Sequence, residues 1–314
     1  HPWVPGLALA VDVLISPLWG MTYLAWAAGC LGIGALLYLA YARGHQVEAQ
    51  EGVIVFKPPA VEEARVGYRV LVPIANPATA GNLLRLAGVL AREQGGEVVA
   101  LQVVTVPEQI PLEEGRHRAA VGRVLLERAM AQAKEEGFAI QTMTRVAHSV
   151  AEGVLETSRD QKVDLILMGW GGYTRLGGAS MGPIIDAVAR NAACDLAVIK
   201  SEERDEIGKI LVPSAGGPHT HLAARLAMML SKAYDAQVTA LYVQSGRASV
   251  QQMEEKKQRI AQVLDGLPFS RPPEQKVVVA DDVVDGIVEE AKGYDLVVLG
   301  ASEERLLDQF IFGS

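Results

Sequence analysis

An internal repeat constrains the fold of this chain more strongly than any other feature of its sequence. The segment VLVPIANPATAGNLLRLAGVLAREQGGEVVALQVV begins at Val70, and the similar segment ILVPSAGGPHTHLAARLAMMLSKAYDAQVTALYVQ begins 140 residues later, at Ile210. Each segment predicts a short β-branched strand, a turn rich in Gly, Pro or Asn, an amphipathic helix and a second strand. The chain is therefore expected to contain two copies of one structural unit.

The repeat continues into a second half of each unit. Residues 143–169 are similar to residues 277–300, and both stretches predict a strand, a helix and an apolar strand. Ser149 and Glu152 form a capping-box pattern at the start of the first of these helices, and Asp282 is placed to cap the second. Apolar strands that alternate with helices predict a parallel sheet covered by helices on both faces.

The fold class predicted for both copies is therefore α/β, with a parallel sheet in each domain. The first domain is predicted at residues 68–201 and the second at residues 207–314. After Gly182 the first domain continues with a helix and a last strand, whereas the chain ends one residue after Gly313. We expect the second domain to be C-terminally incomplete, with a sheet of four strands against five in the first. The short connection at residues 201–209 favours pairing of the two domains within one chain.

Residues 1–43 predict two transmembrane helices. Residues 21–42 form a run of 22 residues without a charge, long enough to cross a hydrocarbon core about 30 Å thick at about 1.5 Å per residue. Residues 3–19 are apolar except for Asp12, and an uncharged, turn-like joint separates the two runs. A signal peptide and a buried helical hairpin of a soluble protein are the alternatives. Asp12 is a residue of a transport path, an interhelical hydrogen-bonding group or a residue near the helix end.

The predicted hairpin leads into a polar segment. Arg43 and His45 follow the second apolar run directly, which favours a cytoplasmic location for that end under the positive-inside rule. We therefore predict a multi-pass protein of the cell (inner) membrane with a cytoplasmic tail, and the lipid bilayer as one of its partners. Residues 44–67, which include Pro58 and Pro59, predict a linker between the membrane helices and the tail.

Charge and cysteine content narrow the range of partners. The chain has 29 Lys and Arg residues against 37 Asp and Glu residues, for a net charge of −8. A nucleic-acid partner would require a basic face, so no nucleic acid is predicted to bind. Cys30 and Cys194 lie far apart and form neither a metal-ligand spacing nor a disulfide framework. A reducing compartment is expected.

A glycine-dense turn is the main candidate binding site. In LILMGWGGYTRLGGASMGPIIDAV, which begins at Leu165, an apolar strand is followed by several glycines and then by an apolar-periodic segment. Glycines let the backbone approach a phosphate, and the N-terminus of the following helix adds a partial positive charge. Gly169, Gly172 and Gly182 are the candidate backbone positions, and Arg175 is a candidate cation within the turn.

These segments resemble the universal stress protein family. The resemblance rests on the ILVP strand, the DLVVLG strand, a turn similar to GxxG-x9-GS, and the segment AACDLAVI at residues 192–199. It covers nearly all of residues 68–314. It implies a flavodoxin-like sheet, dimers built through the final strand and, in one branch of the family, the binding of ATP.

The first copy departs from the nucleotide motif that this resemblance implies. Pro183 stands where the motif has Ser or Thr, which removes one hydroxyl and one N–H group. Ala75 stands where the nucleotide-binding members have an acid that contacts the adenosine. Pro183 still favours the fold, because proline suits the first position of a helix. We predict that ATP binds weakly or not at all; the turn then serves as a tight β-to-α connection.

The second copy departs from the motif in a different way. Gly300, Gly313 and Ser314 fit the pattern, but Glu303 replaces the second glycine and would place a carboxylate near a phosphate. Ala215 stands at the position of the adenosine-contacting acid. The nucleotide site of the second copy is therefore predicted to be degenerate, and no cofactor is expected for the chain.

The N-terminal runs resemble the last two helices of amino acid permeases of the amino acid/polyamine/organocation superfamily, in particular cationic amino acid transporters. The resemblance rests on HPWVPGLALAVDVLISPLW and GCLGIGALLYLAYAR. In such permeases a cytoplasmic tail of tandem universal stress domains is a familiar arrangement. The resemblance implies a regulatory, sensory tail on a secondary amino acid transporter, with the remainder of the transporter as a partner. The alternative is a membrane-anchored nucleotide-binding stress protein without a transport role.

No constellation in the sequence argues for an enzyme, since it contains neither a nucleophile–base pair nor an HExxH motif. His148 and the matching Asp281 lie beside predicted helix caps, which indicates a role in capping. His219 and His221 flank Thr220 in a turn and could bind a metal ion, but no third ligand is in view. We predict no catalytic residue and no metal site.

Overall fold

The computed structural model describes residues 26, 29–33, 53–56, 67–112, 123–171, 181–200, 207–214, 219–246 and 249–300. Its contacts divide the chain into two units, His1–Gln50 and Glu51–Ser314. The predicted membrane hairpin, with Asp12, lies outside the described residues except for residues 26 and 29–33. Among the residues that the structure describes, no helix combines the length and the apolar character that a bilayer crossing requires.

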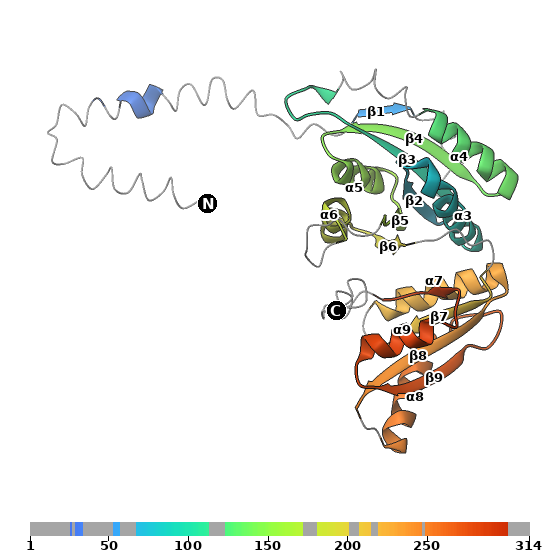
Figure 1. Cartoon of the computed structure of the whole chain (residues 1–314). Coiled ribbons are helices and arrows are strands. Elements are labelled where there is room, and N and C mark those ends of the chain that lie inside the picture. The colour runs from blue at the N-terminus through green and yellow to red at the C-terminus, as the bar shows by residue number, and fades with distance from the viewer. Residues whose placement is uncertain are drawn as a thin grey trace. The chain divides into compact units, whose positions relative to one another are not determined.

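The first copy is a parallel sheet with helices on both faces, as the alternation of strands and helices predicted (Figure 1). Its parallel strands are β2 (Arg69–Pro73), β3 (Glu97–Thr105), β4 (Ile140–Ala147), β5 (Leu165–Gly169) and β6 (Asp195–Ile199). Its helices are α3 (Pro77–Glu93), α4 (Arg123–Glu136), α5 (Val150–Asp160) and α6 (Pro183–Asn191). The α/β class is confirmed.

The parallel strands of the first copy lie in the order β4-β3-β2-β5-β6. Counted along the chain from β2 this is 3-2-1-4-5, one of the doubly wound orders, whereas flavodoxin itself has 2-1-3-4-5. The first strand of the unit therefore lies in the middle of the sheet. The sequence pattern predicted parallel strands but contained no signal for their order.

Alternation along the strands explains why both faces are covered. Val70 and Val72 of β2 belong to the apolar cluster formed with α3 and α4, whereas Leu71 between them belongs to the cluster formed with α5 and α6. The same alternation occurs in β5, where Leu167 faces one layer and Ile166 the other. All five side chains are buried, as is usual for a parallel strand with helices on both faces.

A further strand joins the first sheet from the segment predicted to be a linker. Strand β1 (Val53–Phe56) pairs antiparallel with β4, with Val53 opposite Val146 and Ile54 opposite Arg145. The sheet therefore has six strands, and the prediction of five was wrong for this reason. The segment is short and β-branched, and an open edge strand supplies its backbone partners.

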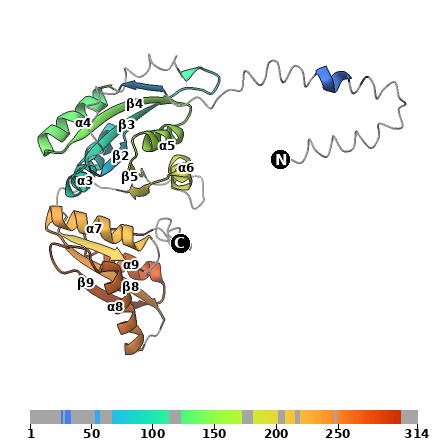
Figure 2. The ribbon, with the colours of Figure 1, turned by 180° about the vertical axis from the view of Figure 1, so that it is seen from behind.

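The second copy has the same arrangement in its described part (Figures 1 and 2). Among the described residues, its sheet has four strands in the order β10-β7-β8-β9, the number predicted. The strands are β7 (Lys209–Pro213), β8 (Gln237–Ser245), β9 (Glu274–Ala280) and β10 (Leu296–Val297). The helices are α7 (Thr220–Tyr234), α8 (Val250–Leu264) and α9 (Val283–Ala291).

The helix starts agree with the capping residues read from the sequence. The Ser149 hydroxyl accepts a hydrogen bond from the Glu152 N–H at 3.1 Å, and the Glu152 carboxylate accepts one from the Ser149 N–H. The Asp282 carboxylate accepts hydrogen bonds from the N–H groups of Val284 and Asp285. These contacts satisfy backbone donors that the first turn of a helix leaves free.

Candidate functional site

The strand order creates a switch point at the carboxyl ends of β2 and β5. The chain passes from β2 to β3 on one side, while β5 pairs with β2 on the other, with Val70 opposite Leu165. In doubly wound sheets, ligands bind outside the carboxyl ends of the strands at such a point. Ala75 follows β2 and Gly169 ends β5, so the structure brings these two predicted site residues to the same edge of the sheet.

Gly169 permits a close approach between β5 and α3. A Cβ atom added at Gly169 would lie 2.9 Å from Cδ1 of Leu83, closer than real Cβ contacts come. Leu83 is a buried member of the α3 face. A side chain at position 169 would therefore have to displace the end of the Leu83 side chain, whether or not a ligand binds beyond it.

Gly182 is the N-cap of α6 and has a backbone conformation that only glycine adopts readily. Its φ is 113° and its ψ is 153°, and no side chain caps the helix there. Pro183 occupies the first helical turn, as predicted. The N-terminus of α6 therefore presents backbone N–H groups without a side-chain cap, but Pro183 contributes none.

The N-terminus of α3 is already capped. The Asn76 carboxamide oxygen accepts a hydrogen bond from the Ala78 N–H at 3.0 Å, and Pro77 occupies the first turn. Ala75, just before this cap, is exposed and offers no polar side chain at the switch point. An anion here would find fewer free donors than an uncapped helix start provides.

Lys200 brings a positive charge to the carboxyl ends of the strands, where it contacts Trp170. No pattern in the sequence singled out either residue. Lys200 follows β6, and its Nζ lies 5.5 Å from the centre of the Trp170 ring, which follows β5. The pairing of Gly169 with Ile199 brings the next residues of both strands together. The contact could not be predicted from the sequence, because it depends on this register between β5 and β6.

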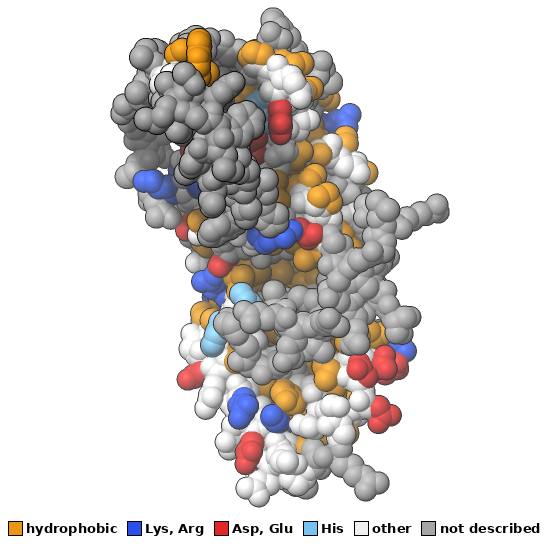
Figure 3. All heavy atoms as spheres, turned by 90° about the vertical axis from the view of Figure 1, so that its left-hand side faces the viewer, with side chains coloured by type: hydrophobic (Ala, Val, Ile, Leu, Met, Phe, Trp, Pro, Cys, Tyr) orange, Lys and Arg blue, Asp and Glu red, His pale blue; other side chains and the backbone are white. Residues whose placement is uncertain are grey.

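On the face drawn in Figure 3, acidic and basic side chains of the described residues are interspersed rather than gathered by sign.

The second copy repeats the close packing at its own switch point. Gly300 follows β10, and a Cβ atom added there would lie 3.0 Å from the backbone C and O atoms of His219, at the start of α7. The remaining predicted site residues, Gly172, Arg175, Gly313 and Ser314, lie outside the described residues.

The histidines take part in local structure in the described part of the chain. The His148 N–H donates to a carboxylate oxygen of Glu152 at 3.1 Å, and its ring Nδ1 lies 3.3 Å from the Val106 carbonyl oxygen. His219 is the N-cap of α7, without a side-chain capping bond. Within the described ranges, no three His, Cys, Asp or Glu side chains gather as a metal site would require.

Comparison with known proteins finds the same family in both copies of the repeat. The profile of the universal stress protein family matches residues 68–200 and again residues 206–314. The chain belongs to this family. The universal stress protein MJ0531 of Methanocaldococcus jannaschii is 27% identical over 122 residues, which cover 37% of this chain and 72% of that protein. A crystal structure of a universal stress protein from Archaeoglobus fulgidus aligns with a TM-score of 0.56, at 12% identity, over 77% of this chain and 88% of that one. That likeness shows the fold.

A longer relative matches most of this chain. The Na(+)/H(+) antiporter NhaS5 of Synechocystis is 28% identical over 260 residues. The match covers 82% of this chain but 36% of the antiporter. The chain thus spans about a third of the length of that relative.

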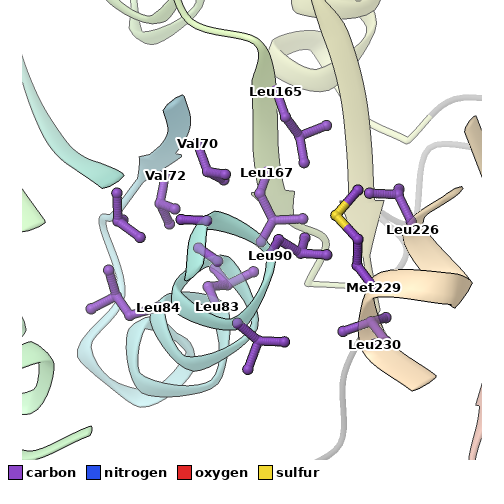
Figure 4. Packing of buried hydrophobic residues seen from close by; sticks show 14 of the residues in the cluster. Val70, Val72, Leu83, Leu84, Leu90, Leu165, Leu167, Leu226, Met229 and Leu230 are labelled. Carbon is purple, nitrogen blue, oxygen red and sulfur yellow. The ribbon is translucent and has the colours of Figure 1, made fainter. Parts of the chain in front are cut away.

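The apolar cluster that covers β2 on the α3 and α4 side continues into the second universal stress domain, and α3 meets α7 within it (Figure 4). Leu90 of the first domain and Leu226, Met229 and Leu230 of the second are buried in it. At the 140-residue offset of the repeat, Leu90 corresponds to Leu230. Equivalent helices therefore meet, as they would in a symmetric dimer of one domain.

A polar group borders this cluster. Arg225 of α7 donates to the Asp195 carboxylate of β6 at 2.6 Å. Tyr68, just before β2, has a buried hydroxyl without a hydrogen-bond partner among the described residues. Burial raises the pKa of Tyr68 to about 12; Asp195 and Asp164 add to the shift, and Arg225 opposes it. Sequence patterns could not predict that Tyr68, Asp195 and Arg225 come together, because Arg225 lies in a different domain from the other two.

Proposed function

We propose that the two universal stress domains form a regulatory, non-enzymatic tail of a secondary membrane transporter. The observation that carries this proposal is the antiporter relative, to which most of this chain aligns while covering 36% of that protein. In that relative, a region similar to this chain is part of a protein named as a transporter. A tail of this kind acts by having different interactions in different states of the carrier.

The contact between the domains supports a joint response. Leu90 and Met229, from equivalent parts of the two domains, lie in the same buried cluster. A change at the switch point of the first domain acts on α3 through Leu83, and α3 packs on α7. Closely packed elements transmit such shifts because their interiors are compressed very little. We therefore include pairing of the two domains in the proposal.

The proposed carrier is an amino acid transporter of the cell (inner) membrane. The support is the resemblance of residues 1–43 to the last two helices of amino acid permeases. In this proposal those residues form a membrane hairpin, Asp12 faces the protein interior, and the tail is cytoplasmic. The lipid bilayer and the remainder of the transporter are the partners.

A second candidate is exchange of Na⁺ for H⁺, which the name of the antiporter relative favours. A third, from a different class, is a membrane-anchored stress protein that binds nucleotide and transports nothing. The three differ in what crosses the membrane. The proposed pairing of the domains is the same for all three candidates.

Transport assays on the complete coding sequence test the proposal. The complete protein and a form ending at residue 67 are placed in sealed vesicles at equal amounts. Uptake of labelled amino acids and Na⁺-driven proton movement are then measured for both. We expect amino acid uptake by both forms, with a changed rate or substrate dependence when the tail is removed. Proton movement alone would favour the exchanger, and no flux would favour the anchor. Equal fluxes in every condition would overturn a regulatory tail.

A further inference from the structure

The two domains differ at one edge of their sheets. Strand β9 of the second domain corresponds to β4 of the first, because each is paired with the second strand of its unit. Strand β4 has β1 on its outer side, whereas no strand in the described part of the chain pairs with the outer side of β9. Within the described ranges, the outer edge of β9 therefore presents backbone N–H and C=O groups that no neighbouring strand pairs.

The residues along these two edges differ in exposure. The registers make Val146 of β4 equivalent to Val279 of β9. Val146 is 0% exposed, while Val279 is 52% exposed. Leu112 and Val106, in the long connection after β3, pack on Val146. The second domain connects β8 to α8 through residues 246–249 alone, which is too short a connection to supply this cover.

We propose that β9 pairs antiparallel with β9 of a second copy of this chain. The covered edge of the first domain shows that this type of unit accepts an antiparallel strand rich in β-branched residues. Pairing of β9 with itself supplies such a strand and closes about a two-fold axis, so neither molecule keeps this edge free. The two four-stranded sheets then form one continuous sheet.

The sequence of β9, EQKVVVA, favours one register for this pairing. A two-fold axis at Val278 places Val277 opposite Val279 of the second copy, twice. Such β-branched pairs directly across antiparallel strands are stabilising. An axis at Lys276 would oppose two lysines. An axis at Gln275 would leave the three valines without partners.

The N-terminal half of β9 carries the charged residues Glu274 and Lys276, and they limit the length of strand that can pair. Lys276 donates to the Glu290 carboxylate at 2.7 Å on the same molecule, so its charge is already compensated. With the axis at Val278, Lys276 lies opposite Ala280 of the second copy. Glu274 and Gln275 extend beyond the end of the partner strand. The pairing therefore uses the apolar half of β9 and leaves the charged half in solvent.

Two substitutions of exposed valines test the proposal in the 314-residue chain, purified in a non-ionic detergent. Val279→Lys places a lysine on each side of the proposed axis. Val124→Lys, on the exposed face of α4, is the matched control, since Val124 is 57% exposed. Sedimentation should show a dimer whose dissociation constant rises at least about tenfold with Val279→Lys and is unchanged with Val124→Lys.

A disulfide test identifies the contact itself. In a background with Cys30→Ser and Cys194→Ser, Val278→Cys lies opposite its own copy across the axis, whereas Val124→Cys does not. Mild oxidation should cross-link two molecules through Val278→Cys and not through Val124→Cys. A chain that stays monomeric overturns the proposal. So does a dimer that is unaffected by Val279→Lys and does not cross-link through Val278→Cys, since it would use another surface.

Discussion

Arg225 and Asp195 join the two universal stress domains through a hydrogen-bonded ion pair of 2.6 Å. Their side chains are 44% and 41% exposed, so water screens the attraction. We predict a coupling energy of about 0.5–1 kcal/mol in a double-mutant cycle with Arg225→Ala and Asp195→Ala, measured by chemical denaturation. Arg123 and Glu127, an exposed pair within α4, are the control and should give about 0.3–0.5 kcal/mol. A coupling above about 2 kcal/mol would contradict this account of screening.

Met229 tests the apolar contact between the domains. It is 1% exposed and lies in the cluster that both domains share. Met229→Ala should lower the free energy of unfolding by about 2–4 kcal/mol, through lost burial and the cavity left behind. Met130→Ala, at a side chain 50% exposed on α4, should change it by less than about 0.5 kcal/mol. Equal effects of the two substitutions would contradict the burial of Met229 in this cluster.

Gly182 tests the backbone of the glycine turn. Its φ of 113° and ψ of 153° are strained for any residue with a side chain, so Gly182→Ala should cost about 1–3 kcal/mol of stability. Gly171→Ala is the control, because Gly171 lacks a positive φ while both positions have open space within 4 Å of an added Cβ atom. Thermal unfolding measured by circular dichroism separates the two variants. An unchanged melting temperature for Gly182→Ala would refute the assignment of this conformation.

Nucleotide binding tests the departures from the family motif. Loss of a hydrogen bond to a charged group costs about 1.5–3 kcal/mol, or roughly one to two decades of affinity. We therefore expect little ATP binding by the unmodified chain in calorimetric titration, and measurable binding by the double variant Pro183→Ser, Ala75→Asp. Replacing Ala75→Asp by Ala75→Asn in that variant keeps the size without the charge and should bind more weakly. Micromolar ATP binding by the unmodified chain would show that other groups replace the missing ones.

Alkaline pH tests the burial of Tyr68. Its pKa is raised from 10.0 to about 12, chiefly because burial disfavours the charged phenolate. The folded chain therefore keeps a proton that the unfolded chain releases between pH 10 and about 12. Stability from this group is fully present below pH 10 and is lost as pH rises through that interval.

Removing the Tyr68 hydroxyl should flatten this dependence. Tyr68→Phe is expected to leave stability at neutral pH nearly unchanged, because the hydroxyl has no partner among the described residues. Its free energy of unfolding should then fall less steeply above pH 10 than that of the unmodified chain. Burial also raises the pKa of Tyr234, so Tyr234→Phe should likewise make the fall in stability above pH 10 less steep. Identical slopes for Tyr68→Phe and the unmodified chain would contradict a buried hydroxyl.

Several features of the fold could be predicted because their causes are local. The capping box of Ser149 and Glu152 depends on residues three positions apart, and the helix then begins at Val150. The alternating burial of Val70 and Leu71 follows from the period of a strand between two helix layers. Gly182 followed by Pro183 indicated the start of α6.

The repeat, the α/β class and the helix starts could therefore be read from the sequence, since the repeat is a direct similarity of two segments and the class and helix starts follow from short spacings. The strand order, the pairing of β1 with β4 and the contact of Trp170 with Lys200 became visible only in the folded chain. It also decided that Arg225 meets Asp195 across the two domains. These contacts join segments far apart along the chain, and they depend on which surfaces pack together. No local period or propensity encodes that choice.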